Sequence, residues 1–364
     1  MSKKFDEYKI AYVHGRPCSH PMQQKEARAI GAKFFPVDFF LRWHDKKTSK
    51  LYKYASIMLC SLFFPKVRSW DFFLGGGAHT TLPLMRVLGI ISKGQKIIVH
   101  FGDEMLYFLH SGRYGEKKKK QLIKMISNYD AYICEGEMQS TIAKALFGKS
   151  KVYTTFNGIP KKQFEQAQQV TANLNSKNLL FIGAVDNDLR LWYKGLDIMV
   201  KAFETAYKKD NELTFTLIGI SAPYQVKLLE KVSDEVRQVI TFIRYTDNIY
   251  DYIERASLYF HCSRGDAFPT TILISMAASL PALVSNWTGT RDILKKVEDK
   301  LVCELKVEVI SERILWYVNL STNERKIIAL KLKKISDNYT ESKALENYKK
   351  VFSIVARDLR QIDN

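Results

Sequence analysis

The sequence predicts an α/β protein with two doubly wound halves, each built around a parallel sheet. Short apolar segments typical of strands alternate with helical patterns along the chain, and such alternation favours parallel sheets covered on both faces. The 364 residues, 46% of them hydrophobic, are enough for two domains with large cores. Polar residues follow several of the apolar segments, where ligand-binding loops of α/β proteins lie.

The first half contains six segments that we expect to be strands. They span residues 9–14, 34–39, 72–74, 96–100, 131–134 and 151–155. Helical patterns fill the gaps between them, including residues 22–30 and 117–127.

The second half repeats the alternation. Its expected strands span residues 178–182, 214–218, 239–242, 258–262 and 281–285. A long basic helical stretch follows at residues 330–359, with a break expected near Tyr339. We place the domain boundaries at residues 1–160, 161–335 and 336–364.

Residues 263–292 are the most informative stretch. They predict a polar loop, a short helix at 270–279 with small residues at its end, a buried strand at 281–285 and a second polar loop. The first loop ends in Asp266-Ala267-Phe268-Pro269, and proline suits the start of a helix because no amide donor is lost there. A loop that leads into a helix N-terminus beside the carboxyl end of a strand is typical of anion and sugar sites.

This stretch resembles the donor-sugar signature of retaining GT-B glycosyltransferases of family 4, the glycosyltransferase group 1 type. Asp266 stands where the signature has its first Glu, and Ala267-Phe268-Pro269 matches the turn after it. Ala278-Ser279-Leu280-Pro281 matches the small-Gly-x-Pro step, with Ser279 in place of Gly. Ile274 stands where the second Glu is expected, which is a departure from the signature.

The resemblance extends over about residues 150–295. Lys194-Gly195 is similar to the family's Lys-Gly helix start, whose Lys holds the donor diphosphate. Ala184 stands at the position of the family's diphosphate-binding Arg, and Arg190 in the same loop could replace it. Residues 240–245, ending in Tyr245, resemble the segment that contacts the donor base, and residues 156–159 resemble the hinge between the domains.

The resemblance implies a GT-B fold, which has two Rossmann-like domains with an interdomain cleft. The first domain would carry the acceptor, and the second would bind the nucleotide-sugar donor. The helix in residues 336–364 would return to the first domain. The implied activity is retaining transfer of a hexose-type sugar, without a carboxylate nucleophile.

The donor site is expected in the second half. Transfer leaves negative charge on the diphosphate, so catalysis needs fixed positive charge there. Lys194, with Arg190, can supply that charge, and Asp266 with the amides of Ala267, Phe268 and Thr270 can bind sugar hydroxyls. The alternatives are a solvated lysine at a helix start and a helix-capping carboxylate.

Candidates in the first half lie at the ends of expected strands. The resemblance places His100 near the donor sugar and Gly15 near the donor phosphates. Asp103 or Glu104, which follow His100 at the end of the strand, could face the acceptor. The alternative for His100 is a hydrogen-bonded structural histidine. Gly75-Gly76-Gly77 permits close approach to an acceptor or simply to a neighbouring helix.

The positive charge is concentrated in the first half. Residues 1–175 hold 28 Lys and Arg against 13 Asp and Glu, so +15 of the +18 net charge lies there. The densest run is Lys117-Lys118-Lys119-Lys120, and Lys46, Lys47, Lys50 and Lys53 lie among aromatic residues. These residues could form an anionic-membrane patch, a solvated face or a nucleic-acid surface, and the resemblance favours the membrane.

Other features narrow the function by exclusion. The five cysteines show no metal-ligand or disulfide spacing, so we expect no metal, no cofactor and a reducing compartment. The polar N-terminus gives no secretory signal, and the apolar run at residues 54–64 is too short to span a bilayer. We therefore expect a cytoplasmic protein at the inner face of the membrane.

The sequence thus predicts an enzyme that moves a sugar from a nucleotide diphosphate-sugar to a glycan or lipid-linked acceptor, in cell-surface polysaccharide or glycolipid synthesis. A catalytically silent GT-B-like subunit that binds membrane or a partner protein is the alternative, supported by Ile274 and Ala184. Nucleic-acid binding would leave the sugar-donor motifs without a role.

Overall fold

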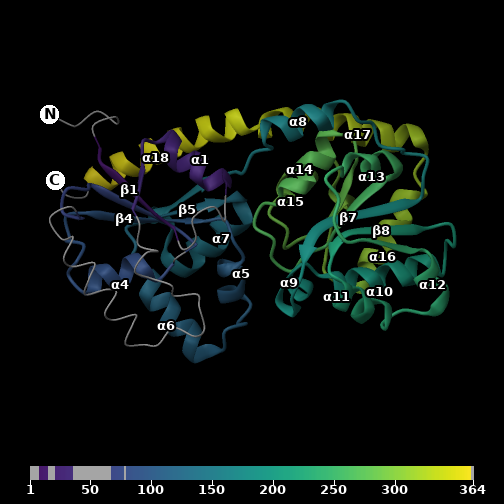
Figure 1. Ribbon diagram of the computed structural model, residues 1–364, viewed down its shortest axis with the longest axis horizontal. Coiled ribbons are helices and arrows are strands. Elements are labelled where there is room, and N and C mark those ends of the chain that lie inside the picture. The colour runs from purple at the N-terminus through teal and green to yellow at the C-terminus, as the bar shows by residue number, and fades with distance from the viewer. Residues whose placement is uncertain (1–7, 15–20, 36–66, 78, 362–364) are drawn as a thin grey trace. The chain divides into compact units, whose positions relative to one another are not determined.

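The computed structural model describes residues 8–14, 21–35, 67–77 and 79–361, without the side chain of His14, and divides the chain into two compact units. Unit 1 comprises residues 1–156 with 344–364, and unit 2 comprises residues 157–343. Each unit has a central sheet with helices on both faces (Figure 1).

In the described part of unit 1, six parallel strands form one sheet in the order β2-β1-β3-β4-β5-β6. The strands are β1 (Ile10–His14), β2 (Lys33–Phe34), β3 (Phe72–Gly76), β4 (Lys96–Phe101), β5 (Ala131–Glu135) and β6 (Val152–Thr155). The helices are α1 (Pro21–Ala29), α4 (Thr81–Val87), α5 (Met105–His110), α6 (Glu116–Ile126), α7 (Gly136–Phe147), the 3-10 helix η3 (Lys149–Lys151) and α18 (Glu341–Gln361).

The C-terminal helix α18 completes the core of unit 1. It lies with α1 on one face of the sheet, while α4, α5, α6 and α7 lie on the other (Figure 1). Phe352 packs edge-on against Phe72 of β3, with ring centroids 5.9 Å apart. The hydroxyl of Tyr153 donates to Asp358 Oδ2 at 3.0 Å, which ties α18 to β6. Residues more than 190 positions apart therefore form one core.

In the described part of unit 2, six parallel strands form a second sheet in the order β12-β11-β10-β7-β8-β9. They are β7 (Asn178–Val185), β8 (Thr214–Ile220), β9 (Ile240–Ile243), β10 (Leu258–His261), β11 (Ala282–Ser285) and β12 (Val302–Cys303). The helices are α8 (Lys161–Gln168), α9 (Asp188–Tyr193), α10 (Leu196–Tyr207), α11 (Ala222–Leu229), α12 (Asp234–Gln238), α13 (Tyr250–Arg255), α14 (Thr270–Ala277), α15 (Arg291–Lys295), α16 (Val307–Val318) and α17 (Thr322–Ser336), with 3-10 helices η4 (Asp299–Leu301) and η5 (Asp337–Tyr339).

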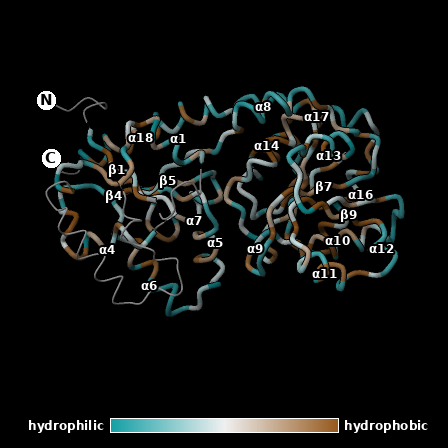
Figure 2. The backbone as a smooth tube through the Cα atoms, in the orientation of Figure 1, coloured by the Kyte–Doolittle hydropathy of each residue, from teal (hydrophilic) through white to brown (hydrophobic). Residues whose placement is uncertain are grey.

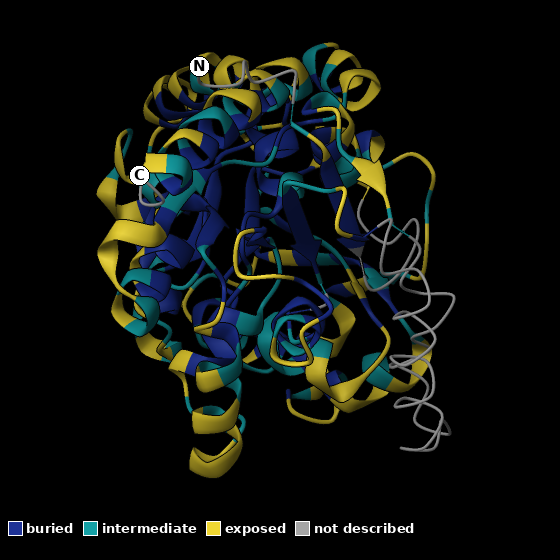
Figure 3. Ribbon diagram, turned by 90° about the vertical axis from the view of Figure 1, so that its left-hand side faces the viewer, coloured by how far each residue is buried: buried dark blue, intermediate teal, exposed yellow. Residues whose placement is uncertain are grey.

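Most residues of the strands are apolar and buried, whereas both residues of the edge strand β2 are exposed and the edge strand β9 is only partly buried. Hydrophobic residues follow the strands in Figure 2, and Figure 3 shows buried strands beneath helices whose outer faces are exposed. Strands buried on both faces read as continuous apolar runs, which is why the sequence pattern located them.

The predicted α/β class with two parallel sheets is confirmed, and several details differ from expectation. Strand β7 continues to Val185, with an irregular register against β8 after Ile182. The two-residue strand β12 was not expected, because it is too short to produce a pattern. Lys194 does not start a helix but follows α9, and Gly195 precedes α10. Of the strand expected at 34–39, residues 36–39 lie outside the described residues.

Candidate functional site

The strand order of unit 2 locates its candidate site. Strand β7 is the first in sequence, β8 follows on one side and β10 on the other, so the winding reverses between β7 and β10. Ligands of open α/β sheets bind outside the carboxyl ends of the strands at this switch point. His261 ends β10, and the loop that follows it carries Asp266.

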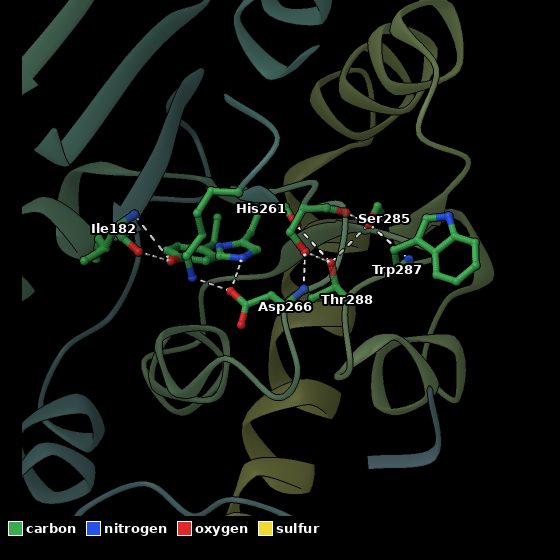
Figure 4. A network of polar contacts seen from close by, with 9 residues as sticks. Ile182, His261, Asp266, Ser285, Trp287 and Thr288 are labelled. Carbon is green, nitrogen blue, oxygen red and sulfur yellow. Dashed lines mark hydrogen bonds and ion pairs between the residues drawn. The ribbon is translucent and has the colours of Figure 1, made fainter. Parts of the chain in front are cut away.

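The carboxylate of Asp266 binds two nitrogens through one oxygen. Lys194 Nζ lies 2.5 Å and His261 Nε2 2.9 Å from Asp266 Oδ2 (Figure 4). The side chains of Lys194 and Asp266 are 16% and 14% exposed, and that of His261 is fully buried. Burial alone would raise the pKa of Asp266, but Lys194 and the hydrogen bond from His261 hold that pKa well below its ordinary value. The site therefore contains a carboxylate.

The Lys194 position is fixed by a close approach of backbone to backbone. Gly195 has φ +75°, and a Cβ there would lie 2.2 Å from the carbonyl oxygen of Cys262. Only glycine accepts both the left-handed backbone and this contact without strain. The α9–α10 junction therefore lies directly against the carboxyl end of β10, which brings Lys194 to Asp266.

Arg264, in the loop that carries Asp266, binds the α9–α10 junction. Its guanidinium binds both carboxylate oxygens of Asp197, at 2.7 and 2.8 Å, and donates to the Trp192 carbonyl at 2.5 Å. Its backbone amide donates to the Tyr193 carbonyl at 2.7 Å. A bidentate arginine–carboxylate pair fixes orientation as well as distance, so Arg264 holds the segment that presents Lys194.

Hydroxyl groups fix the loop itself. Ser263 Oγ accepts from the Asp266 amide at 3.2 Å and lies 3.0 Å from Thr288 Oγ1. Ser285 Oγ donates to the Ser263 carbonyl (Figure 4). The Gly289 amide donates to the Asp266 carbonyl at 2.9 Å. The two polar loops recognised in residues 263–292 thus bind one another.

The start of α14 leaves backbone donors available. Within the described residues, the amides of Ala267 and Phe268 donate no hydrogen bond. Pro269 precedes α14 with φ −65°, and no side chain caps this helix, so Asp266 does not act as a helix cap. The hydroxyl of Thr270 accepts from Asn157 Nδ2 at 3.4 Å. Free amides beside a helix N-terminus suit anionic or hydroxyl-bearing ligands.

Other residues expected to bind the donor lie apart from the Asp266 carboxylate. Arg190 is on α9, where its guanidinium lies 3.5 Å from Asp186. Tyr245 follows the edge strand β9, is 76% exposed and donates to Asp247 at 2.7 Å. Ile274 is buried in α14 at 2% exposure, whereas Ala184 is exposed near the end of β7.

His100 lies in a buried polar cluster of unit 1. Its ring is 2% exposed, with Nδ1 3.6 Å from Glu26 Oε2 and Nε2 3.3 Å from Glu135 Oε1. Tyr348 of α18 covers the ring, with centroids 5.3 Å apart. Side chains alternate along a strand, so His100 shares with Ile98 the face that α1 and α18 cover. His100 is therefore buried within unit 1, and a catalytic role for His100 remains a prediction.

Burial and the neighbouring charges change the pKa values of Glu26 and His100. Burial raises the pKa of Glu26 to about 8, with a further rise from Glu135 and an opposing effect from His100. Burial lowers the pKa of His100, but Glu26 and Glu135 together raise it above its ordinary value. The cluster consequently binds protons more tightly in the folded chain.

The acceptor-side candidates follow β4. Asp103 Oδ2 lies 2.7 Å from His79 Nε2, and its Oδ1 accepts from the Met105 amide at 3.1 Å. Glu104 immediately precedes α5 without capping it. Gly15 lies outside the described residues.

The lysines of the predicted membrane patch lie on α6. Lys117, Lys118 and Lys120 are exposed, while Lys119 is partly covered and lies 4.0 Å from Glu116. Lys46, Lys47, Lys50 and Lys53 fall outside the described part of the chain. Across the described residues, no helix has the length and apolarity needed to cross a membrane, and no group of three His, Cys, Asp or Glu side chains could hold a metal ion.

Sequence reasoning missed His261 and Arg264 as parts of the site. His261 looked like an isolated histidine on an apolar strand. Arg264 stands two residues before Asp266, and its partner Asp197 stands three residues after Lys194. Each of the two motif residues therefore has an opposite charge within three positions of it, which was a usable signal.

Comparison with known proteins places this site in a recognised domain. The family model for glycosyl transferases group 1 matches residues 176–319, which contain all strands of unit 2 in the described structure. An uncharacterized glycosyltransferase of Haemophilus influenzae is 22% identical over 231 residues, a match covering 62% of this chain and 61% of the relative. The match thus spans less than two thirds of that relative's length.

Solved structures show the same fold at low sequence identity. Anabaena HepE in complex with UDP matches with a TM-score of 0.67 and 13% identity, over 95% of this chain and 99% of the other. A UDP-forming trehalose-phosphate synthase of Burkholderia xenovorans matches with a TM-score of 0.64 and 11% identity, over 98% and 100%. Residues 176–319 thus match the family model for glycosyl transferases group 1, and the described chain has the two parallel α/β sheets of the GT-B fold.

Proposed function

We propose that this protein is a glycosyltransferase that moves a sugar from a nucleotide diphosphate-sugar, bound in unit 2, to a glycan or lipid-linked acceptor. The observation that carries the proposal is the Lys194–Asp266 pair at the switch point between β7 and β10. It combines a cation for a diphosphate with a carboxylate for sugar hydroxyls, next to the unpaired amides of Ala267 and Phe268.

The chemistry follows from the charge that develops during transfer. As the bond between sugar and diphosphate breaks, the diphosphate gains negative charge, and Lys194 stabilises it. Asp266 and the two amides hold the sugar in position while the acceptor attacks. We propose retention of configuration, without a carboxylate nucleophile and without a metal, since Lys194, Arg190 and the start of α14 can balance the diphosphate.

The donor base is best sought among uridine nucleotides. HepE is found with UDP and with UDP and glucose, and the B. xenovorans synthase is UDP-forming. Those ligands belong to proteins that share only the fold, so they supply the first donors to test. Tyr245, exposed after β9, is our candidate for stacking on the base.

In this proposal, unit 1 binds the acceptor and contacts the membrane. Asp103 and Glu104 would face the acceptor, and the lysines of α6 would hold the protein against an anionic membrane at its cytoplasmic face. Exposure of Lys117, Lys118 and Lys120 supports this docking role. The product would be a cell-surface polysaccharide or glycolipid.

One observation favours a second candidate function. Ile274 is buried at the position where the family signature has its second Glu, so that carboxylate is lost without an evident replacement. A hydrogen bond to a charged group contributes roughly 1.5–3 kcal/mol, enough to weaken donor binding about tenfold to a hundredfold. A catalytically silent GT-B-like subunit would tolerate that loss.

A nucleotide panel separates the two functions. Melting temperature is measured with UDP, GDP, ADP and their glucose conjugates, and each conjugate is scored for hydrolysis. The enzyme proposal predicts stabilisation by one nucleotide and slow hydrolysis of its conjugate. Absence of both effects with every nucleotide would contradict it and favour the silent subunit.

A further inference from the structure

We infer that His261 is a positioning residue: its hydrogen bond holds Asp266 Oδ2, so that Oδ1 stays available for a hydroxyl of the bound sugar. The inference rests on the proposed function and deepens it, because it assigns a specific ligand atom within the Asp266 site. It starts from an asymmetry in the described structure. Lys194 and His261 both bind Oδ2, whereas Oδ1 accepts no hydrogen bond from any described residue.

The imidazole is held rigidly. It stacks on Phe181, with centroids 5.3 Å apart, and on Tyr259, with centroids 6.0 Å apart and planes 14° apart. Tyr259 is itself fixed, because its hydroxyl donates to the Ile182 carbonyl at 2.9 Å and accepts from the Ile182 amide at 3.3 Å (Figure 4). The ring of His261 therefore cannot turn without breaking contacts to β7.

The protonation state of His261 follows from its surroundings. Burial lowers the pKa of His261, although Asp266 opposes that effect. The imidazole is thus neutral. Since Asp266 is a carboxylate, Nε2 carries the proton and donates a hydrogen bond to Oδ2. Nδ1 is buried and has no hydrogen-bond partner among the described residues. The ring has one polar contact, and that contact orients Asp266.

The geometry explains why a short Asp can serve where the family signature has a longer Glu. A carboxylate held by one oxygen from two directions has little rotational freedom, so Oδ1 keeps a fixed position without cost when the sugar binds. Lys194 can move toward the diphosphate during binding, and His261 then remains as the donor that holds Oδ2. We therefore expect loss of the His261 hydrogen bond to weaken binding of the nucleotide-sugar but not binding of the free nucleotide.

Two substitutions separate hydrogen bonding from packing. His261→Phe keeps an aromatic ring between Phe181 and Tyr259 but removes the donor. His261→Gln places an amide donor near the former Nε2 position. Both variants are compared with the unmodified protein for binding of UDP and of UDP-glucose by titration calorimetry, after unfolding transitions confirm that each is folded.

The expected result is selective. His261→Phe should bind UDP as the unmodified protein does and UDP-glucose about tenfold more weakly, which is the effect of one charge-assisted hydrogen bond. His261→Gln should recover most of that loss. Equal weakening of both ligands, or no weakening of UDP-glucose, would overturn the inference while leaving the proposed function intact. If the unmodified protein binds neither UDP nor UDP-glucose and no other nucleotide of the panel, the proposed function fails and the inference fails with it.

A ligand-free measurement tests the same assignment independently of the donor. In protein labelled with ¹⁵N-histidine, the two ring nitrogens of His261 report its tautomer by their chemical shifts. A neutral ring protonated at Nε2 between pH 7 and 8 is expected. A ring protonated at Nδ1 or at both nitrogens over that range would overturn the positioning role, whatever nucleotide the protein binds.

Discussion

Lys194 and Asp266, 72 residues apart in sequence, are counter-ions, with Nζ 2.5 Å from Oδ2. The charges of the two groups proposed to bind the donor are therefore paired with each other, although Asp266 Oδ1 accepts no hydrogen bond from any described residue. Under the proposed function, a donor that offers both a diphosphate and a hydroxyl would replace this contact, so the proposal predicts selectivity for a complete nucleotide-sugar.

Replacement of Lys194 should abolish most activity. Lys194→Ala is expected to lower sugar transfer at least about a hundredfold, because it removes the positive charge at the leaving group. It should also lower the melting temperature, since Asp266 would keep its buried charge without its main counter-ion. Lys201→Ala, an exposed lysine of α10, is the matched control and should be unaffected. Near-normal sugar transfer by Lys194→Ala would indicate that Arg190, and not Lys194, binds the diphosphate.

The cluster of Glu26, His100 and Glu135 should make stability fall as pH rises. The pKa of Glu26 is raised to about 8 in the folded chain, and that of His100 is also raised, so the folded state binds more protons than the unfolded state. Their stabilising contribution is complete below the unfolded pKa values and is lost as pH rises through the folded ones. The slope can reach about 1.4 kcal/mol per pH unit for one group.

Urea unfolding followed between pH 5 and pH 8.5 measures this slope. Glu26→Gln should flatten the pH dependence, because the amide does not titrate. A free energy of unfolding that is constant over this range in the unmodified protein, or that rises with pH, would show that the cluster does not retain its protons on folding.

Ser279→Gly should stabilise the protein. Ser279 has φ 59°, in the left-handed region that costs a residue with a side chain about 1–2 kcal/mol. Glycine removes that strain but gains freedom in the unfolded chain, so the net gain should be roughly 0.5–1 kcal/mol. Equilibrium unfolding in urea checks it. A loss of stability would mean that the serine side chain contributes more than its backbone costs.

These predictions also show what the sequence could reveal. Apolar strands buried on both faces were found from the apolar runs along the sequence. Asp266 and Lys194 stood in recognisable local patterns. Ser279 occupies the Gly position of its motif, and its positive φ shows why glycine is usual there. The contacts of His100 could not be predicted, because Tyr348 reaches it from the far end of the chain. His261 was missed for a similar reason, since Phe181, which stacks on its ring, comes from β7.

Neutralising the lysines of α6 tests the membrane proposal. Replacing Lys117–Lys120 by Gln should release the protein from phosphatidylglycerol vesicles in cosedimentation, while turnover of a soluble acceptor stays nearly unchanged. Binding should weaken steeply with salt, because exposed charges are screened within about 10 Å at 0.1 M. Lys161→Gln with Lys162→Gln, exposed lysines of α8, serves as the control. Salt-insensitive binding, or no binding by the unmodified protein, would indicate that these lysines form only a solvated face.

The most direct test of the donor site compares two variants with two ligands. Lys194→Ala and Asp266→Asn are titrated with the nucleoside diphosphate that the panel identifies and with its sugar conjugate. Lys194→Ala should weaken both ligands, because both carry the diphosphate, whereas Asp266→Asn should weaken only the conjugate, because its partner is the sugar. If both variants bind both ligands as the unmodified protein does, the donor does not bind at the Lys194–Asp266 pair and the account is contradicted.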